Sequence, residues 1–220
     1  MAVIDVVILG RSGCGKGTQA RRLAERFGLA AVSPGDRFRE LAATSSWTGQ
    51  KVRSIIDAGG LPPYWLGAHL WLAELIDKIA PDQGVIFDGT PRRLEEAKLI
   101  DEILAWYERT NVHVFLLDIS REEARRRLMG RRICEGCATL SGPVADAAAE
   151  QQCVVCGGRL VNRPDDTPEA IEKRLDWFDV DIMPLVHYYE TQGRLTRVKG
   201  ERPIEVVAGE LAQAVATHLT

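Results

Sequence analysis

Short apolar runs alternate with longer amphipathic segments along most of the chain. Runs of Val, Ile and Leu that end at Gly or Asp are typical of buried parallel strands, and apolar residues every three or four positions are typical of helices. We predict strands over residues 3–9, 29–32, 85–87, 112–119 and 195–198. We predict helices over residues 20–27, 64–79, 92–107, 122–129, 168–189 and 203–219. This alternation predicts an α/β fold, with a parallel sheet of about five strands flanked by helices.

Two segments depart from the alternation. Residues 33–61 read as two short helices, and residues 130–163 hold four of the five cysteines with little regular pattern. We interpret both as insertions above a core formed by residues 1–32, 62–129 and 164–220, where moving lids are often placed. In the long helix over 168–189, Thr167 suits the N-cap and Pro168 the first turn, and Pro184 should kink or break the helix.

The composition is that of an ordinary globular protein. Apolar residues make up 45% of the 220 residues and charged residues 27%, which excludes a disordered or collagen-like chain. The net charge of −3 argues against a protein that coats nucleic acid. No apolar stretch is long enough to span a bilayer. The N-terminal run contains Asp5 and lacks a basic region, so we expect no signal peptide and a cytoplasmic enzyme.

The most specific motif follows the first predicted strand. Residues Gly10 to Thr18 match G-x4-G-K-G-T, the phosphate-binding loop, between a strand and a helix as that loop requires. Its glycines let backbone N–H groups cradle phosphate oxygens, and the helix N-terminus adds partial positive charge. Lys16 would reach the β and γ phosphates, and Thr18 would hold Mg²⁺. We therefore predict a P-loop NTPase-like sheet whose ATP site includes Gly13, Cys14, Gly15, Lys16, Gly17 and Thr18.

Four cysteines form two Cys-x2-Cys pairs, Cys134 with Cys137 and Cys153 with Cys156, separated by fifteen residues. This spacing is typical of a four-thiolate zinc site. Because four protein ligands leave no open position, the zinc should be structural. The alternative is two reduced pairs without a metal. Cys14 stands apart, either as a small packed residue or as a reactive thiol beside a lysine.

Phosphoryl transfer needs a metal-binding carboxylate and positive charge around the transferring group. Asp88 ends a hydrophobic strand and suits Mg²⁺ or its waters. Arginines stand at several isolated places, and each alone would read as a solvated surface charge. They are Arg39, Arg92, Arg127, Arg131, Arg163 and Arg174.

In the order of these motifs the chain resembles the adenylate kinase family of nucleoside monophosphate kinases, over residues 3–206. The matching pieces are Gly13-Cys-Gly-Lys-Gly-Thr-Gln-Ala20, Gly35-Asp36 with Arg39, Asp57-Ala-Gly59, Asp88-Gly-Thr-Pro-Arg92, Gly130-Arg-Arg132, Asp165-Asp166, Lys173-Arg174-Leu175, and Pro184-Leu185 with Tyr188-Tyr189. The cysteine-bearing segment stands where that family has its lid and resembles the zinc-containing lids of bacterial members. The resemblance implies a monophosphate-binding insertion at 33–61 and a zinc-binding lid at 130–163.

The resemblance also implies roles for single residues. Arg127 would lie against the donor base, and Arg39 and Arg92 would hold the acceptor phosphate. The implied catalytic residues, grouped around the transferring phosphoryl group, are Lys16, Arg92, Arg131, Arg163 and Arg174, with Arg131 also in the ATP site. The implied acceptor site comprises Pro34, Gly35, Arg39, Ile56, Arg92, Glu96, Arg163 and Arg174. No side chain need act as a strong base, because the attacking phosphate oxygen is already anionic. Both insertions would close over the nucleotides and exclude water.

Several residues depart from the family pattern. Ser12 replaces the usual proline of the loop, and Thr90 replaces a phenylalanine. Ser141-Gly142 stands where a Tyr-His pair would contact the donor base. Two changes affect the acceptor base: Pro34 removes a threonine hydroxyl, and Glu96 replaces a glutamine. The phosphate-binding residues are therefore intact, whereas the residues that read the bases differ.

The favoured function is transfer of the γ-phosphoryl group from ATP to AMP, with Mg²⁺, a structural Zn²⁺ and a monomeric enzyme. One alternative is a kinase that prefers another base, because an ionised Glu96 would match the N1–H and 2-amine donors of guanine. Another is a P-loop ATPase whose zinc ribbon acts on nucleic acid. The segment between Cys137 and Cys153 disfavours it, because it has no basic or aromatic residue. A nucleotide sensor with little turnover is a third. We expect no nucleic-acid or membrane partner.

Overall fold

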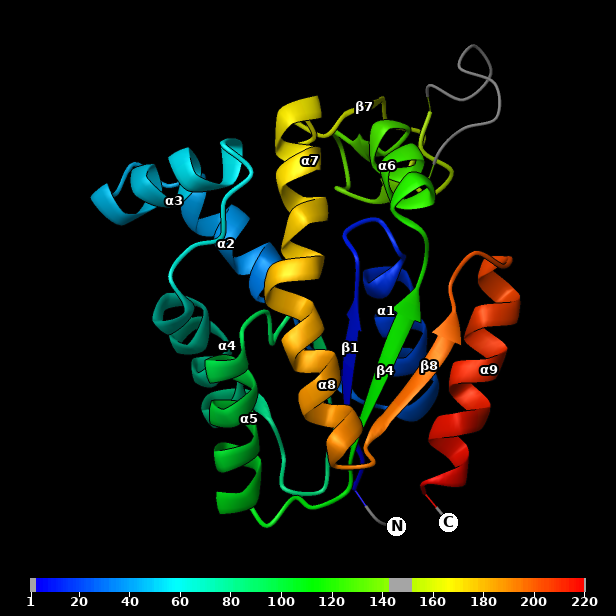
Figure 1. Cartoon of the computed structure of the whole chain (residues 1–220). Helices are drawn as coiled ribbons and strands as arrows, with labels where there is room; N and C mark the ends of the chain where they lie inside the picture. The colour runs from blue at the N-terminus through cyan, green and yellow to red at the C-terminus, as the bar shows by residue number, and fades with distance from the viewer. Residues whose placement is uncertain (1–2, 143–151, 220) are drawn as a thin grey trace.

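The computed structural model describes residues 3–142 and 152–219. Its centre is a five-stranded sheet in which every neighbouring pair is parallel, with the strand order β2-β3-β1-β4-β8. Strands β1, β4 and β8 are labelled in Figure 1. The strands are β1 (Asp5–Gly10), β2 (Ala30–Val32), β3 (Val85–Asp88), β4 (Val112–Asp118) and β8 (Leu195–Lys199). The predicted α/β class and all five predicted strands are confirmed.

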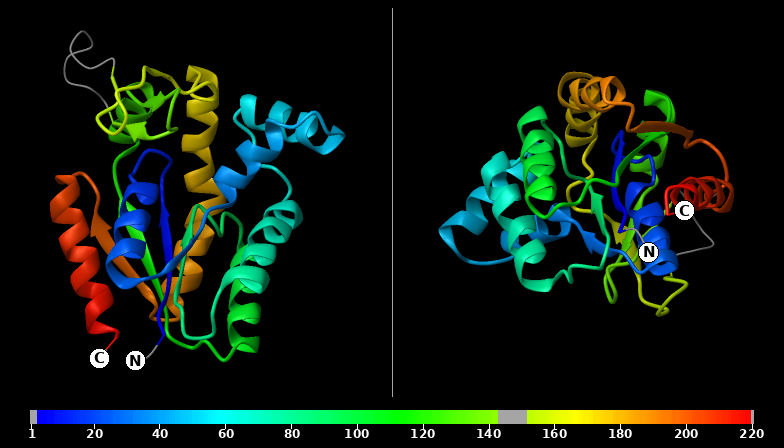
Figure 2. Two further views of the ribbon diagram at one scale, coloured as in Figure 1. Left: turned by 180° about the vertical axis from the view of Figure 1, so that it is seen from behind. Right: turned by 90° about the horizontal axis from the view of Figure 1, so that it is seen from below.

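Helices cover both faces of the sheet (Figure 2). In β1 all six residues are buried, and Val6 and Ile8 pack on the side of α1 and α9, whereas Val7 and Leu9 pack on the side of α4, α5 and α8. A strand buried on both faces must be apolar throughout, which is the pattern that predicted it. The core helices are α1 (Lys16–Phe27), α4 (Tyr64–Lys78), α5 (Leu94–Trp106), α6 (Arg121–Met129), α7 (Pro168–Trp177), α8 (Met183–Thr191) and α9 (Ile204–Thr217). Among the described residues no helix has the length and apolarity to cross a membrane.

The predicted long helix is one continuous helical path with a change of hydrogen bonding inside it (Figure 1). It begins as predicted, because the Thr167 hydroxyl accepts the N–H of Ala170 at 3.2 Å. Between α7 and α8 a π-helical turn spans Phe178–Ile182, and the N–H of Met183 binds the carbonyl of Phe178. Pro184 follows directly and has no N–H to donate. The prediction for Pro184 is thus confirmed in part: regular α-helical bonding is interrupted, but the helix neither stops nor separates.

Residues 33–61 form two helices that project from the core, as their pattern predicted. They are α2 (Pro34–Ala42) and α3 (Trp47–Asp57), drawn in blue to cyan in Figure 1. The segment around the cysteines contains a second, antiparallel sheet in the order β6-β5-β7. Its strands are β5 (Arg132–Cys134), β6 (Leu140–Ser141) and β7 (Leu160–Asn162). The sequence missed this sheet because strands of two or three residues are too short to show a period. Part of the predicted lid segment, residues 143–151, lies outside the described residues.

Candidate active site

The turns that follow the carboxyl ends of β1, β3 and β4 meet at one edge of the sheet, where parallel α/β proteins bind their ligands. The first of these turns is the predicted phosphate loop. Gly10 has a φ of +147°, and a Cβ there would lie 2.6 Å from the carbonyl oxygen of Leu117. Lys16 begins α1, and its ammonium donates to the carbonyls of Gly10 (2.7 Å) and Arg11 (3.0 Å). Cys14 is 4% exposed and packs in the core, which supports its reading as a packed residue.

A pocket lies beside this loop, and we call it the loop pocket. It is lined by Ile8, Leu9, Gly10, Arg11, Ser12, Lys16, Gly89, Pro91, Arg92, Arg174, Trp177, Phe178 and Ile182. Arg11 fixes the loop to the π-helical turn, since its Nη2 lies 3.0 Å from Asp179 Oδ1 and its guanidinium lies 4.0 Å from the centre of the Phe178 ring. No local sequence pattern signals this contact, because the two segments are 168 positions apart.

Asp88 ends β3 next to the phosphate loop. The register pairs it with Ile8 of β1, and its Oδ2 lies 3.0 Å from the position of a Cβ on Gly17. Burial raises the pKa of Asp88, and the nearby Lys16 and Arg92 oppose this rise. Within the described part of the chain no group donates a hydrogen bond to its carboxylate. A carboxylate beside the loop, with the Thr18 hydroxyl one residue after Gly17, is a donor set that suits Mg²⁺.

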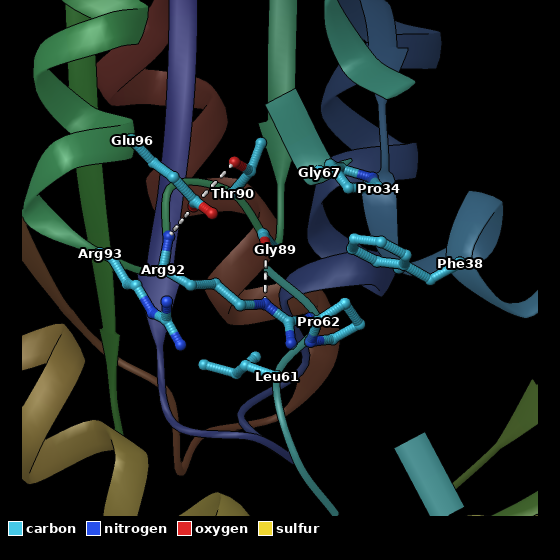
Figure 3. Close-up of a pocket in the computed structure, with 11 residues that line it drawn as sticks. Pro34, Phe38, Leu61, Pro62, Gly67, Gly89, Thr90, Arg92, Arg93 and Glu96 are labelled. Carbon is cyan, nitrogen blue, oxygen red and sulfur yellow. Dashed lines mark hydrogen bonds between the residues drawn. The ribbon is translucent and has the colours of Figure 1, made fainter. Parts of the chain in front are cut away.

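A second pocket lies between α2, α4 and the start of α5, and we call it the α2–α4 pocket (Figure 3). It is lined by Pro34, Gly35, Phe38, Leu61, Pro62, Gly67, Gly89, Thr90, Arg92, Arg93 and Glu96. Two predicted arginines meet at its end: a Cβ on Gly35 would lie 3.7 Å from Arg39 and 3.8 Å from Arg92. Arg39 pairs with Asp36, and Arg92 Nε donates to the carbonyl of Gly89 at 2.7 Å. Arg92 and Gly89 line both pockets, so the two pockets adjoin at this guanidinium.

Glu96 is the acidic residue of this pocket, whereas its neighbour Glu95 is exposed. Glu96 is only 8% exposed. Its Oε2 accepts the backbone N–H of Arg92 at 2.6 Å and the hydroxyl of Thr90 at 3.4 Å. Burial raises the pKa of Glu96 despite these hydrogen bonds and the two nearby arginines. Ile56, predicted for the same site, lies half-buried on α3 and does not line the pocket.

Three of the predicted arginines form one cluster with two aspartates. Arg131 binds both oxygens of Asp166 at 2.7 Å, and Arg174 binds the same carboxylate at 2.6 Å. Arg163 Nε lies 2.8 Å from Asp165, which also contacts Arg174 at 3.2 Å. Withdrawal from water and the repulsion of nearby arginines lower the pKa of Arg163 to about 10. In the sequence, Asp165 and Asp166 match a family motif, but the motif predicts no role for them. In the structure they hold the three arginines in place.

Arg127 comes from α6 and lies over the start of α1. Its Nε pairs with Glu123 at 2.6 Å, and its Nη2 donates to the carbonyl of Gly200 at 3.0 Å. A longer contact of 3.4 Å joins Nη1 to the carbonyl of Cys14 in the phosphate loop. The side chain therefore stands at the outer side of that loop, between it and the turn after β8.

The four paired cysteines converge, although they come from two turns far apart in the chain. Their sulfur atoms all lie within 4.8 Å of one another, with Cys134 Sγ 3.4 Å from Cys156 Sγ and Cys137 Sγ 3.6 Å from Cys153 Sγ. Tetrahedral zinc with bonds of about 2.3 Å separates its sulfur ligands by about 3.8 Å. Gly158 permits the approach, because a Cβ there would lie 2.9 Å from Cys134 Sγ. The donor set and spacing fit zinc.

Comparison with known proteins agrees with this geometry. The family profile described as "Adenylate kinase" matches residues 8–194. The chain is 37% identical to the adenylate kinase of Nitrosococcus oceani over 96% of this chain and 98% of that protein. It is 36% identical to the adenylate kinase of Pelobacter propionicus over 93% of each chain, and 32% identical to that of Thermosipho africanus over 96% of this chain and 99% of that protein.

The chain belongs to the adenylate kinase family. It is therefore an enzyme of the nucleoside monophosphate kinase class, and the four cysteines give it the zinc-lid type of that family. The lining residues that the sequence analysis did not predict are mostly apolar or small. They are Phe38, Leu61, Pro62, Gly67, Pro91, Trp177, Phe178 and Ile182. Residues of this kind carry no chemical motif, so only the folded chain reveals them.

Proposed function

We propose that this adenylate kinase family member transfers the γ-phosphoryl group of ATP to AMP and forms two molecules of ADP. The family supports the reaction class, phosphoryl transfer between ATP and a nucleoside monophosphate. The observation that carries the rest is the position of Arg92, which lines the loop pocket and the α2–α4 pocket at once. One guanidinium can then hold the acceptor phosphate in line with the donor's γ-phosphate.

In this proposal the loop pocket binds ATP. The backbone of Gly13, Cys14, Gly15 and Gly17 cradles the phosphates, and the N-terminus of α1 adds its partial positive charge. Lys16 exchanges its bonds to the loop carbonyls for bonds to the β and γ phosphates. Thr18 and Asp88 would hold Mg²⁺, which neutralises charge on the phosphates when bound. Arg127 lies on the outer side of the loop, where the donor base would extend.

The α2–α4 pocket would bind AMP. Arg39 and Arg92 converge at Gly35 and offer two guanidiniums to the acceptor phosphate. Phe38 provides an aromatic face for the base. Pro34 and Glu96 replace the family's base-reading threonine and glutamine, so the base contacts differ from those of the family. Ile56 would contact AMP only after a movement of α3 toward the pocket.

The arginine cluster would stabilise the charge that develops during transfer. Arg174 lines the loop pocket together with Arg92, and ion pairs with Asp165 and Asp166 keep Arg131, Arg163 and Arg174 in place before substrate arrives. No base is required, because the acceptor phosphate oxygen is already anionic. Residues 33–61 and 130–163 would close over the two nucleotides and exclude water. The monomeric state, the cytoplasmic location and the lack of a nucleic-acid partner stay predictions.

An assay of ADP formation tests the proposal. Purified protein with MgATP is supplied in turn with AMP, GMP, CMP and UMP, and we expect turnover with AMP. In Arg92→Lys we expect kcat to fall by about 100-fold or more, because lysine cannot bridge two phosphates bidentately. Hydrolysis of ATP that no monophosphate stimulates would instead favour the ATPase alternative, and nucleotide binding without turnover would favour a sensor.

A further inference from the structure

The carboxyl group of Glu96 has one oxygen that the protein uses and one that it leaves open. Oε2 accepts the backbone N–H of Arg92 and the hydroxyl of Thr90 (Figure 3). Among residues 3–142 and 152–219, no group donates a hydrogen bond to Oε1. A Cβ on Gly67 of α4 would lie 3.9 Å from Oε1. The open oxygen therefore faces the space beside Gly67, in the wall of the α2–α4 pocket.

That space is kept free by a glycine inside a helix, where glycine is a poor helix former. A Cβ on Gly67 would also lie 3.4 Å from the Phe38 ring. The lack of a side chain thus leaves a narrow space with an aromatic ring on one side and Oε1 on another. A flat heteroaromatic base is the kind of group that such a space accepts, with its edge toward Oε1.

The charges around Glu96 do not fix its ionisation. The charged groups on the surrounding elements are Arg92 and Arg93 on its own loop, Asp88 at the end of β3, and Asp36 and Arg39 on α2. Asp36 and Arg39 form an ion pair with each other. The residue of α4 that faces Glu96 is Gly67, which carries no charge. Withdrawal from water is the largest influence and raises the pKa of Glu96 above that of an exposed glutamate. Burial therefore favours the protonated form of the Glu96 carboxyl group more than in an exposed glutamate.

The two purines differ at the atom that would face this oxygen. N1 of adenine accepts a hydrogen bond, whereas N1 of guanine carries a hydrogen and donates, with the 2-amine as a second donor. An ionised carboxylate only accepts, and a protonated carboxyl group can donate. We propose that Glu96 selects the acceptor base through its protonation state, so that the carboxylate takes GMP and the protonated acid takes AMP. This inference rests on the proposed function, and it deepens that function by making the acceptor depend on pH.

The experiment compares kcat/KM for AMP and GMP between pH 5.5 and 8.5, with MgATP saturating. The titration of the two monophosphates' phosphate groups is shared and cancels in the GMP/AMP ratio. We expect this ratio to rise about tenfold or more with pH in the native enzyme. A buried carboxyl group that faces N1 of the wrong purine leaves a hydrogen bond unmade, which weakens binding of that purine. In Glu96→Gln the amide can donate at every pH, so the ratio should favour AMP and stay flat. Glutamine can still accept the Arg92 N–H, so this variant keeps the bond that ties Arg92 to α5.

Glu95→Gln is the matched control, since Glu95 is exposed one position earlier on the same helix. It should keep the ratio and the pH dependence of the native enzyme. A native ratio that is independent of pH overturns the inference, as does a pH dependence that survives in Glu96→Gln. Either result would leave Glu96 as a structural group that accepts the Arg92 N–H. Failure of the proposed function is distinct, because no monophosphate would then yield ADP at any pH.

Discussion

Arg131 forms a bidentate ion pair with Asp166, in which Nε and Nη2 each lie 2.7 Å from a carboxylate oxygen. Arg174 binds the same carboxylate, whose side chain is 4% exposed. Burial alone would raise the pKa of Asp166, but the two arginines outweigh it and hold that pKa below its ordinary value. The aspartate is thus fixed as an anion, and it holds two guanidiniums in position at the junction of the core and the second sheet.

Replacing Asp166 by asparagine should reduce both stability and turnover. The change leaves the buried guanidinium of Arg174 and the half-buried one of Arg131 without their shared charge, which costs about 3 kcal/mol in the free energy of unfolding. We expect kcat to fall as well, since both arginines lose their fixed positions. Urea unfolding and steady-state kinetics measure the two effects. Asp118→Asn is the control, because Asp118 is half-exposed and its ion pair with Arg197 is a long one, at 3.7 Å. Equal stability of the two variants would contradict the structural role given to Asp166.

Lys16→Ala should abolish most turnover and leave the fold intact. The Lys16 ammonium is the cation that the phosphate loop offers to the transferring group, so we expect kcat to fall by about a thousandfold. Its hydrogen bonds to two backbone carbonyls both stay within the phosphate loop itself, so the melting temperature should change little. The exposed Lys98 on α5 provides the control Lys98→Ala. Near-normal kcat in a folded Lys16→Ala protein is incompatible with the proposed mechanism.

The sequence predicts those parts of the fold whose pattern is local. A fully apolar run such as β1 identifies a strand buried on both faces, and Thr167 with Pro168 identifies the start of α7. The short strands of the second sheet have no such pattern, since the cysteine cluster rather than a hydrophobic period brings them together. The sequence does not predict the π-helical turn either. Pro184 signals an irregularity in the helix, but the form of that irregularity depends on what the helix packs against.

Within the candidate site, sequence motifs identify the charged residues. They do not identify the apolar residues that line the pockets or the ion-pair partners of the charged residues. The phosphate loop and the arginines stand in recognisable motifs, and the structure brings Arg39 and Arg92 together at Gly35. Phe38 and Gly67 carry no chemistry of their own, so their place in the pocket follows only from the packing of α2 against α4. The pair of Arg11 and Asp179 joins segments 168 positions apart, and no local rule could predict it.

His113 should make the protein less stable at mildly acidic pH. It lies on β4 with its ring stacked on that of His218, and its Nδ1 is buried without a partner in the described part of the chain. Burial lowers the pKa of His113 from 6.5 to about 4. Because the folded value is the lower one, protonation favours the unfolded chain, and the stabilisation present above pH 6.5 is lost as pH falls toward 4.

Urea unfolding at pH 7 and pH 5 measures this loss. We expect His113→Gln to lose less stability than the native protein between these pH values, by about 1 kcal/mol. Using the difference between proteins removes the contribution of other titrating groups. His69→Gln, at an exposed position on α4, should behave as the native protein does. If His113→Gln and the native protein lose the same amount, then the neutral buried form of His113 does not contribute.

The cysteine cluster should carry one zinc ion per chain. Four thiols whose sulfur atoms lie within 4.8 Å of one another match the spacing that zinc imposes on its ligands. Cys134 and Cys153 are buried, and Cys134 lies on β5, the strand that pairs with both neighbours in the second sheet. Because metal binding and folding are coupled in such sites, removing the ion should unfold this small sheet. Elemental analysis of the purified protein measures the metal content.

Chelation then tests what the metal does. A strong chelator should lower the melting temperature by several degrees, and added zinc should restore it. Turnover should fall, because β5 begins directly after Arg131 and Arg163 follows β7, so these arginines lose their support. ATP should still bind to the phosphate loop, which belongs to the core. In Cys137→Ser, with three thiolates left, we expect weaker zinc retention and a melting temperature between those of the native and chelated proteins. Purified protein without metal, whose melting temperature a chelator does not change, would show that the cysteines are two unbound pairs.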